Sequence, residues 1–307
     1  MKTRSRRRKP RIVGLPPGGA NSSHQQLTQA ASRPSLEEGT MQETNVTPIR
    51  PAHQAHGSES AATHQCDQCM VASLCLSRGL APADRNAFKE VVAGSRIARR
   101  NEAISQQGQP LKTLMVVRSG SVKRVMHSPT GEQHLLSFHL PGHVIGFDAM
   151  ASGTHPAMTV ALETSSLCLL PVRALESLCS RNPAIQQRVM QASALCIVEG
   201  HERARLLSRR AAEQRIAGFL LLLARHQSAR RLNARQFNLP MARQDIANYL
   251  CLAFETVSRV LSGLASNQVI EIHNRSLHIL EPSRLAEIAD EPEFAGSTAI
   301  SSRAQTA

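Results

Sequence analysis

Short apolar runs alternate with turn signals between residues 96 and 172, and this pattern limits the possible folds more than any other feature of the chain. The runs are Leu114–Val117, Leu135–Leu140, Val144–Phe147, Val160–Leu162 and Leu167–Val172. Gly, with Pro or Ser nearby, stands in most of the gaps between them. Short strands joined by glycine-containing turns are typical of an antiparallel barrel or jelly roll. The sequence therefore predicts a β-roll in this region.

A long helix without Pro is predicted over residues 184–207. Small or apolar residues recur along it at spacings of three and four, at Met190, Ser193, Ile197, Gly200, Ala204 and Leu207. Such spacing forms the seam of a coiled coil, and the small members would let two helices approach closely. The segment is therefore a candidate dimerisation helix of a homodimer, although a helix packed on its own domain would show a similar stripe.

Two short helices joined by a turn are predicted within residues 241–266. The inner face of the first, over 243–250, carries Ile246, Ala247 and Leu250. The second begins at Phe254, and its inward positions are Val257, Val260, Leu261 and Leu264. A small hairpin around Asn274 is expected to follow, which makes the pattern a winged helix-turn-helix.

The second helix of this pair leaves polar side chains on its outer, N-terminal face, namely Glu255, Thr256, Ser258 and Arg259. Helix-turn-helix proteins place this part of the helix against base edges in the major groove. Arg can donate two hydrogen bonds to guanine, and Glu can accept one from a cytosine amino group. Together with Arg243 in the first helix, these residues are candidate contacts to double-stranded DNA. The alternative is an ordinary helical hairpin with solvated polar residues.

Basic residues are unevenly placed along the chain, whose net charge is +13. Residues 1–11 carry seven Lys or Arg and no acid, and residues 203–282 carry twelve Arg against five acids. Basic segments suggest a polyanionic partner, although a solvated surface gives the same pattern. No apolar run is long enough to span a membrane, and no apolar stretch follows the basic N-terminus. A cytoplasmic protein without a membrane partner is expected.

Three of the seven cysteines stand together, at Cys66, Cys69 and Cys75. Disulfides are not expected in a reducing compartment, so this triplet requires another explanation. Its spacing can wrap one inorganic centre, but three Cys are ambiguous between zinc and iron–sulfur. An all-thiolate [4Fe–4S] cluster requires a fourth Cys, which can be distant in the sequence.

The segment Met241–Leu264 (MARQDIANYLCLAFETVSRVLSGL) closely resembles the helix-turn-helix of the CRP/FNR family of bacterial regulators. Further stretches are similar to the FNR branch and extend the match over about residues 64–284, namely Ser137–Met150, Ala161–Cys168 and Ala212–Phe219. The resemblance implies that Glu255, Ser258 and Arg259 read a TTGAT-type half-site of a palindromic operator. It also implies RNA polymerase as a partner.

The resemblance supplies the fourth cluster ligand as well. In the family, an N-terminal Cys triplet of this spacing and a Cys after an ALET-like strand hold a [4Fe–4S] cluster, and Cys168 occupies that position. The implied activity is oxygen sensing, in which loss of the cluster releases DNA. Two positions depart from the family: Cys251 stands where Gly is usual, and Ala253 stands where a hydroxyl residue would cap the second helix.

The implied fold class is α+β, with five parts along the chain. Residues 1–62 are rich in polar residues and Pro and are expected to be disordered. A Cys-rich segment and a β-roll effector domain, like a cyclic-nucleotide-binding jelly roll, follow over residues 63–183. The dimerisation helix takes residues 184–207 and the winged helix-turn-helix domain residues 208–284. Residues 285–307 are expected to be a mostly disordered tail.

Other functions remain as alternatives. The Cys triplet would be a structural zinc site if the effector were a different small molecule. A cyclic-nucleotide sensor is disfavoured because the stretch Gly146–Val160 contains no Arg to hold a phosphate. Haem binding through one of the histidines is disfavoured because surface imidazoles explain them. A metal-dependent enzyme is disfavoured because the chain has no acid–base pair, nucleophile motif or nucleotide loop.

Overall fold

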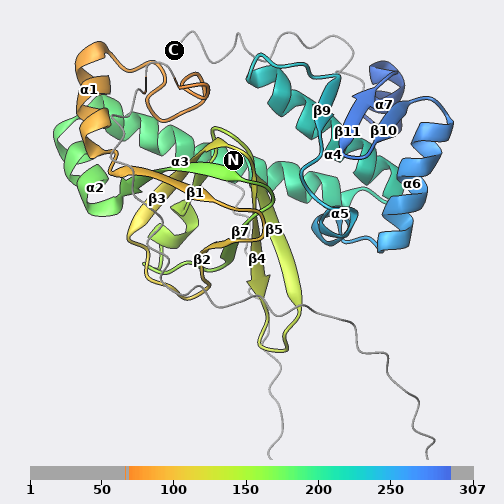
Figure 1. The fold of residues 1–307 in the computed structure, drawn as a ribbon, viewed down its shortest axis with the longest axis horizontal. Helices are drawn as coiled ribbons and strands as arrows, with labels where there is room; N and C mark the ends of the chain where they lie inside the picture. The colour runs from red at the N-terminus through yellow and green to blue at the C-terminus, as the bar shows by residue number, and fades with distance from the viewer. Residues whose placement is uncertain (1–65, 67–68, 292–307) are drawn as a thin grey trace, which may run out of the picture. The chain divides into compact units, whose positions relative to one another are not determined.

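The computed structural model describes residues 66 and 69–291 of the chain (Figure 1). The disordered segment predicted over residues 1–62 therefore lies outside the described residues, as does most of the predicted tail. The described part begins with turns that carry the Cys triplet, followed by helix α1 (Pro82–Val91). Its secondary structure then divides into a β domain, a long helix and a mainly helical C-terminal domain (Figure 1).

The β domain contains two four-stranded antiparallel sheets, which confirms the predicted β-roll. One sheet has the order β1-β8-β3-β6 and consists of Gly94–Ala98, Ser165–Pro171, Thr113–Ser119 and Val144–Ile145. The other has the order β2-β7-β4-β5 and consists of Ala103–Ser105, Met158–Ala161, Val122–His127 and Gln133–His139. A 3-10 turn, η2 (Phe147–Met150), follows β6. Most of the predicted apolar runs became strands at or close to their predicted positions.

Strand β8 lies in the interior of its sheet and separates two apolar clusters. Its alternate residues Leu167 and Leu169 pack in the cluster within the roll. Cys168 and Leu170 belong to the cluster on the other face, because successive side chains of a strand point to opposite faces. That second cluster includes Phe88 of α1. Helix α1 and the turns that carry the Cys triplet thus cover the outer face of the sheet.

Two helices leave the β domain, α2 (Val172–Arg181) and α3 (Pro183–Ser208). Asn182 separates them and caps α3, since its Oδ1 accepts a hydrogen bond from the Ile185 amide at 3.1 Å. The same side chain donates from Nδ2 to Asp84 Oδ1 of α1 at 2.6 Å. A single Asn therefore fixes the start of the long helix and joins it to the helix that follows the cysteines.

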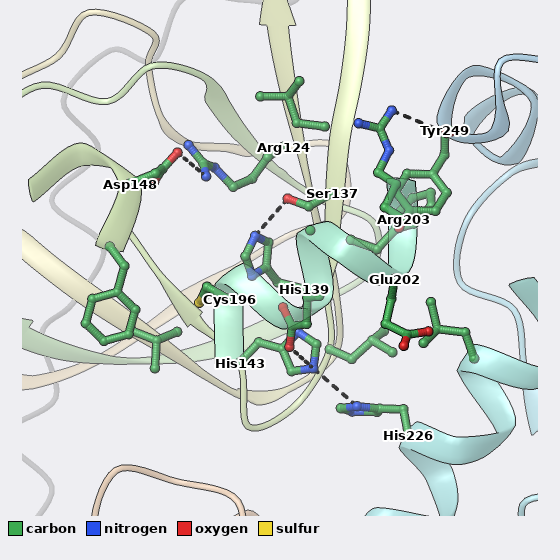
Figure 2. Close-up of a pocket in the computed structure, with 18 of the residues that line it drawn as sticks. Arg124, Ser137, His139, His143, Asp148, Cys196, Glu202, Arg203, His226 and Tyr249 are labelled. Carbon is green, nitrogen blue, oxygen red and sulfur yellow. Dashed lines mark hydrogen bonds and ion pairs between the residues drawn. The ribbon is translucent and has the colours of Figure 1, made fainter. Parts of the chain in front are cut away.

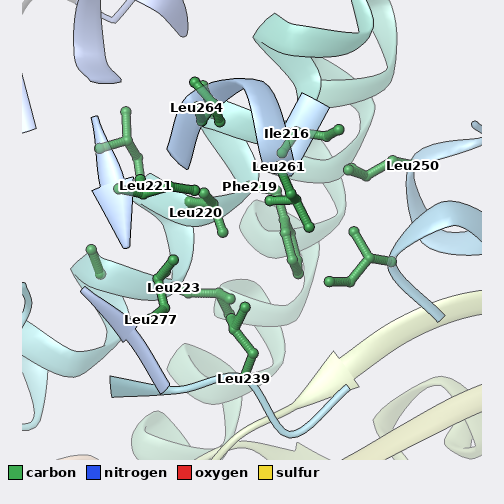
Figure 3. Close-up of a cluster of buried hydrophobic side chains, with 14 of the residues drawn as sticks. Ile216, Phe219, Leu220, Leu221, Leu223, Leu239, Leu250, Leu261, Leu264 and Leu277 are labelled. Carbon is green, nitrogen blue, oxygen red and sulfur yellow. The ribbon is translucent and has the colours of Figure 1, made fainter. Parts of the chain in front are cut away.

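The C-terminal domain is built on α4 (Ala212–Ala229), whose apolar side chains form the centre of the largest core (Figure 3). Around it lie α5 (Arg243–Leu250), α6 (Phe254–Ser266) and a small sheet of β9 (Gln236–Asn238), β10 (Ile270–His273) and β11 (Ser276–Ile279). The predicted hairpin around Asn274 is formed by β10 and β11. The winged helix-turn-helix architecture is confirmed.

The chain continues in ordered form beyond residue 284, where the sequence had predicted the tail to start. Helix α7 (Pro282–Ile288) places Leu285 and Ala286 in the core against α4. Glu291 then lies buried among three arginines, Arg205, Arg209 and Arg225. Its carboxylate therefore ties the end of α3 to α4, a role that composition alone does not reveal.

The turn between α5 and α6 carries local strain at Cys251. This residue ends α5 with φ 53° and ψ 51°, in the left-handed region, which costs a residue with a Cβ roughly 1–2 kcal/mol. Ala253, at the start of α6, provides no side-chain cap. Cys251 therefore lacks the conformational freedom that the usual Gly would have, and Ala253 lacks the cap that a hydroxyl residue would provide.

We predict that Glu291→Gln lowers the free energy of unfolding by about 3 kcal/mol at pH 7, because it leaves three arginines around a neutral side chain. Burial raises the pKa of Glu291, but hydrogen bonds from Arg225 and Arg209 outweigh it and hold the pKa below its ordinary value of 4.5. The carboxylate's contribution is thus complete above pH 4.5 and is lost as pH falls through the lowered pKa. Urea unfolding at several pH values should show that the difference in the free energy of unfolding between the wild-type protein and Glu291→Gln becomes smaller in acid. Glu213→Gln, on an exposed position of α4, is the control and should change stability little.

We predict that Cys251→Gly stabilises the protein by about 0.5–1 kcal/mol, because glycine adopts the left-handed conformation without strain but loses more entropy on folding. Cys251→Ala is the matched control, since it removes the thiol and keeps the Cβ. It should leave stability unchanged. Equal stabilisation by both substitutions in reducing urea titrations would show that the thiol, and not the backbone, is the cause.

Candidate functional site

Helix α6 presents the predicted DNA-reading residues on one side and buries the other. Val257, Leu261 and Leu264 are buried in the domain core. Glu255 and Arg259, one helical turn apart, are exposed and share the outer face. Arg259 can donate to guanine, and Glu255 can accept from a cytosine amino group.

The remaining predicted DNA-binding residues are less uniformly placed. Arg243 is exposed at the first position of α5, and Thr256 is half-buried. The Ser258 hydroxyl is covered by its neighbours and has no hydrogen-bond partner among the described residues. Ser258 must therefore rotate its side chain before it can contact a base.

Helix α5 makes polar contacts with the β domain that sequence reasoning missed. Lys123 Nζ of β4 lies 2.5 Å from Asp245 Oδ1. Asn248 accepts from the Leu135 amide and donates to the Gln133 carbonyl, both at 2.9 Å. The Asn248 side chain thus continues the hydrogen bonding of β5. The sequence did not indicate this role of Asn248, because a polar residue on a helix can equally be exposed to solvent.

The four predicted cluster ligands line a single small cavity. Cys66, Cys69 and Cys75 come from the turns before α1, and Cys168 comes from β8. Cys168 pairs with Ser95 on one side and Val116 on the other, so its position in the sheet is fixed by two neighbouring strands. The turns are held by their own backbone, as in the bond from the Cys75 amide to the Val71 carbonyl at 2.8 Å.

Burial favours the protonated form of two of these thiols. It raises the pKa of Cys168 to about 12, against the opposing effect of Arg118, while the neighbouring Cys75, Cys69 and Cys66 raise it further. Burial also raises the pKa of Cys75. A set of thiolates at this position therefore requires a cation to compensate their charge.

The residue types that line the cavity favour a metal centre, whereas the volume of the cavity does not. The cavity wall contains four Cys and no His, Asp or Glu, which suits either an iron–sulfur cluster or zinc. Its volume is only about 20 Å³, enough for one water-sized atom. In the part of the chain that the structure describes, no three Cys, His, Asp or Glu are close enough to hold one metal ion. A bound centre therefore requires the Cys side chains to be arranged differently from the way they lie here.

The other three cysteines are separate from this cavity. Cys179 and Cys196 are half-buried on α2 and α3, and Cys251 is exposed in the turn after α5. They are the natural controls for any test of the four-cysteine set.

The predicted seam of α3 is largely uncovered in the single chain. Met190 is 66% exposed and Ile197 61% exposed, and Gly200 and Ala204 are also exposed. Ser193 and Leu207 are half-buried, and the Ser193 hydroxyl donates to the Val189 carbonyl. Two further exposed apolar residues, Leu195 and Val198, extend the surface beyond the predicted stripe.

Two family models match the two domains of the chain. The family model of the Crp-like helix-turn-helix domain matches residues 214–288, and that of the cyclic nucleotide-binding domain matches residues 95–182. No helix in residues 69–291 is long and apolar enough to cross a membrane.

Curated relatives match over most of the chain. The transcriptional activator protein Anr of Pseudomonas protegens is 35% identical over 241 residues, which cover 78% of this chain and 95% of that protein. The fumarate and nitrate reduction regulatory protein of Vibrio cholerae is 31% identical over 240 residues, covering 78% of this chain and 96% of the relative.

Solved structures show the same architecture. FixK2 of Bradyrhizobium japonicum is 27% identical with a TM-score of 0.58, and the match covers 63% of this chain and 96% of that one. TTHB099, a CRP-family regulator of Thermus thermophilus, supports the fold alone at 22% identity and a TM-score of 0.53, covering 64% of this chain and 96% of that one. With an exposed recognition helix, a β-roll and these relatives, the chain belongs to the CRP/FNR family and is a DNA-binding transcription regulator of its FNR/Anr branch.

Proposed function

We propose that the chain is an oxygen-responsive transcription regulator in which Cys66, Cys69, Cys75 and Cys168 hold a [4Fe–4S] cluster. The observation that supports this most is the meeting of all four cysteines at one cavity, although Cys168 follows Cys75 by 93 residues. Relatives that bear the name anaerobic regulatory protein, such as that of Pasteurella multocida at 34% identity, are consistent with it. When bound, such a cluster would react with oxygen and be lost.

The Cys-bearing turns are followed by residues that pack against α2 and the start of α3. Leu76 and Leu80, just after the Cys triplet, share an apolar cluster with Leu178 of α2 and Ile185 of α3. The Asn182–Asp84 hydrogen bond adds a polar link at the start of α3. A shift of the Cys-bearing turns would therefore change contacts made by the first turns of the long helix.

The exposed apolar surface of α3 then determines whether two chains associate. We infer a homodimer in which the α3 helices pair along Met190, Ile197 and Ala204, with Ser193, Gly200 and Leu207 beside them. A dimer places two copies of α6 in successive major-groove turns of a palindromic TTGAT-type operator, whereas one copy contacts a half-site. The regulator would act in the cytoplasm, where the operator and RNA polymerase are found.

We predict that Ser in place of any one of the four cysteines abolishes the visible cluster absorption of anaerobically purified protein. Cys179→Ser and Cys196→Ser are the controls and should retain it, because their thiols lie outside the cavity. Iron, sulfide and zinc analyses accompany the spectra. Stoichiometric zinc without iron would favour a structural zinc site and a different effector, and a full cluster in Cys168→Ser would refute the ligand set.

The same preparations test the coupling to dimerisation. The intact protein should be dimeric without oxygen and should shift towards monomer after exposure to air, with a parallel loss of operator affinity. Sedimentation velocity measures the first change and fluorescence anisotropy the second. A dimer equally tight in both conditions would contradict this mechanism even if the cluster were present.

We predict that Glu255→Ala or Arg259→Ala weakens binding to a TTGAT palindrome by about 1–3 kcal/mol and changes binding to random duplex far less. The reason is that both side chains lie exposed on the outer face of α6, where they can reach base edges. Gln268→Ala, at an exposed position after the end of α6, is the matched control. Anisotropy titrations at one salt concentration provide the measurement. Equal losses on both duplexes would mean that these residues contact phosphates only.

A further inference from the structure

The C-terminal end of α5, directly before the turn to α6, has backbone carbonyls that its own helix cannot satisfy. The last four carbonyl groups of a helix have no partner within it. In α5 the first two of these, on Ala247 and Asn248, accept amides of the following turn at 2.9 Å and 3.3 Å. The carbonyls of Tyr249, Leu250 and Cys251 accept no backbone amide from the part of the chain that the structure describes. These three groups need donors from elsewhere, either water or side chains.

Two arginines from outside the helix-turn-helix supply such donors. Arg203 of α3 donates from Nη2 to the Tyr249 carbonyl at 3.3 Å (Figure 2). Arg215 of α4 donates from Nη1 to the Leu250 carbonyl at 3.2 Å and lies 3.5 Å from the Cys251 carbonyl. Arginines also suit the negative end of the helix dipole. The end of α5 is therefore closed by side chains of α3 and α4.

Arg215 makes a second contact, with the end of the long helix α3. Its Nε donates to the Arg209 carbonyl at 2.8 Å. Arg209 is the C-cap of α3, and its carbonyl accepts no backbone amide from residues 69–291. Two nitrogens of one rigid, planar guanidinium thus hold carbonyls at two breaks in the chain, one after α3 and one after α5.

The end of α3 is itself held in place, so it can anchor Arg215. The largely buried side chain of Arg209 donates to the Gln214 carbonyl at 2.9 Å and pairs with Glu291. Gly218 of α4 leaves room for it, because a Cβ at that position would collide with the Arg209 guanidinium. Glycine in a helix interior is unfavourable relative to alanine, and here the space it leaves is used. The carbonyl that Arg215 binds is therefore fixed by packing and ion pairing around Arg209.

The turn before α6 has little local stabilisation of its own. Cys251 adopts the left-handed conformation, and Ala253 gives α6 no side-chain cap. Glu255 follows Cys251 by four residues, so a change in the turn moves the reading face of α6. Base readout depends on hydrogen-bond distances, which tolerate only small displacements. Contacts from outside the turn therefore determine where α6 begins.

We propose that Arg215 is a positioning residue for operator reading, because it ties the turn before α6 to the end of α3 and so keeps Glu255 and Arg259 at the base edges. The proposal rests on the proposed reading by these two side chains and adds a residue that reads no base itself. The competing role is a direct contact with a DNA phosphate, since Arg215 is only half-buried. The two roles differ in their effect on random duplex.

The test is Arg215→Lys in the full-length protein, prepared without oxygen. Lysine keeps the charge but replaces the two donating nitrogens with one. We expect affinity for a TTGAT palindrome to fall about tenfold and affinity for random duplex to change by less than about twofold. The salt dependence of binding should keep its slope, because the number of phosphate contacts is unchanged. Fluorescence anisotropy at several salt concentrations measures all three quantities.

Arg210→Lys is the matched control, since Arg210 is an exposed arginine beside the same end of α3. It should leave the ratio of the two affinities unchanged. Hydrogen–deuterium exchange provides a readout without DNA: peptides over residues 251–256 should exchange faster in Arg215→Lys, and peptides of the β-roll should not. If Arg215→Lys does not fold, the same comparison is made in a Cys251→Gly background, in which the relaxed turn offsets the lost stability.

Three results would overturn the proposal: an unchanged affinity ratio in Arg215→Lys, equal losses on both duplexes, or unchanged exchange at the turn. Equal losses with a shallower salt dependence would identify a phosphate contact instead. If the wild-type protein does not prefer the TTGAT palindrome, the proposed operator is wrong. A duplex that the wild-type protein selects from a random pool then replaces it, so Arg215 is still tested. Glu255→Ala on the same duplexes tests the proposed reading separately.

Discussion

The apolar cover of strand β8 is the contact on which the rest of the molecule depends. Cys168 and Leu170 lie on a sheet face that must be shielded from water, and Phe88, Leu76 and Leu80 of the Cys-bearing segment shield it. The same cluster includes Ile185 of α3. Because packed interiors transmit displacements rather than absorb them, the position of the Cys turns and the position of α3 are mechanically joined. The Cys-bearing segment and the long helix therefore share one hydrophobic core.

The connection between the β domain and the recognition unit is both apolar and polar. The apolar core around Phe219 maintains the geometry of α6, and Leu135 of β5 belongs to the same buried cluster. Phe138 of β5 also packs its ring against that of Phe219. Asp245 and Asn248 add polar contacts to β4 and β5. The recognition unit and the β domain are therefore joined by a shared apolar contact as well as by hydrogen bonds.

The sequence determined those features that depend on local periodicity and residue type. Alternating runs and glycine turns predicted the β-roll, and the spacing of Val257, Leu261 and Leu264 predicted the buried face of α6. The strain at Cys251 followed from its residue type, because a Cβ in the left-handed region is unfavourable wherever it occurs. The association of Cys168 with the triplet was implied only by family resemblance, because sequence spacing does not show whether residues 93 positions apart lie close together.

Only the tertiary structure decided which polar residues were withdrawn from water and what they met there. Glu291 and Asn248 look like ordinary surface residues in the sequence, yet one lies buried among three arginines and the other extends the hydrogen bonding of β5. Arg124 likewise became a buried cation, paired with Asp148, through the folding of a β-roll around it. The free energy of such groups depends on partners distant in the chain, which no local pattern specifies.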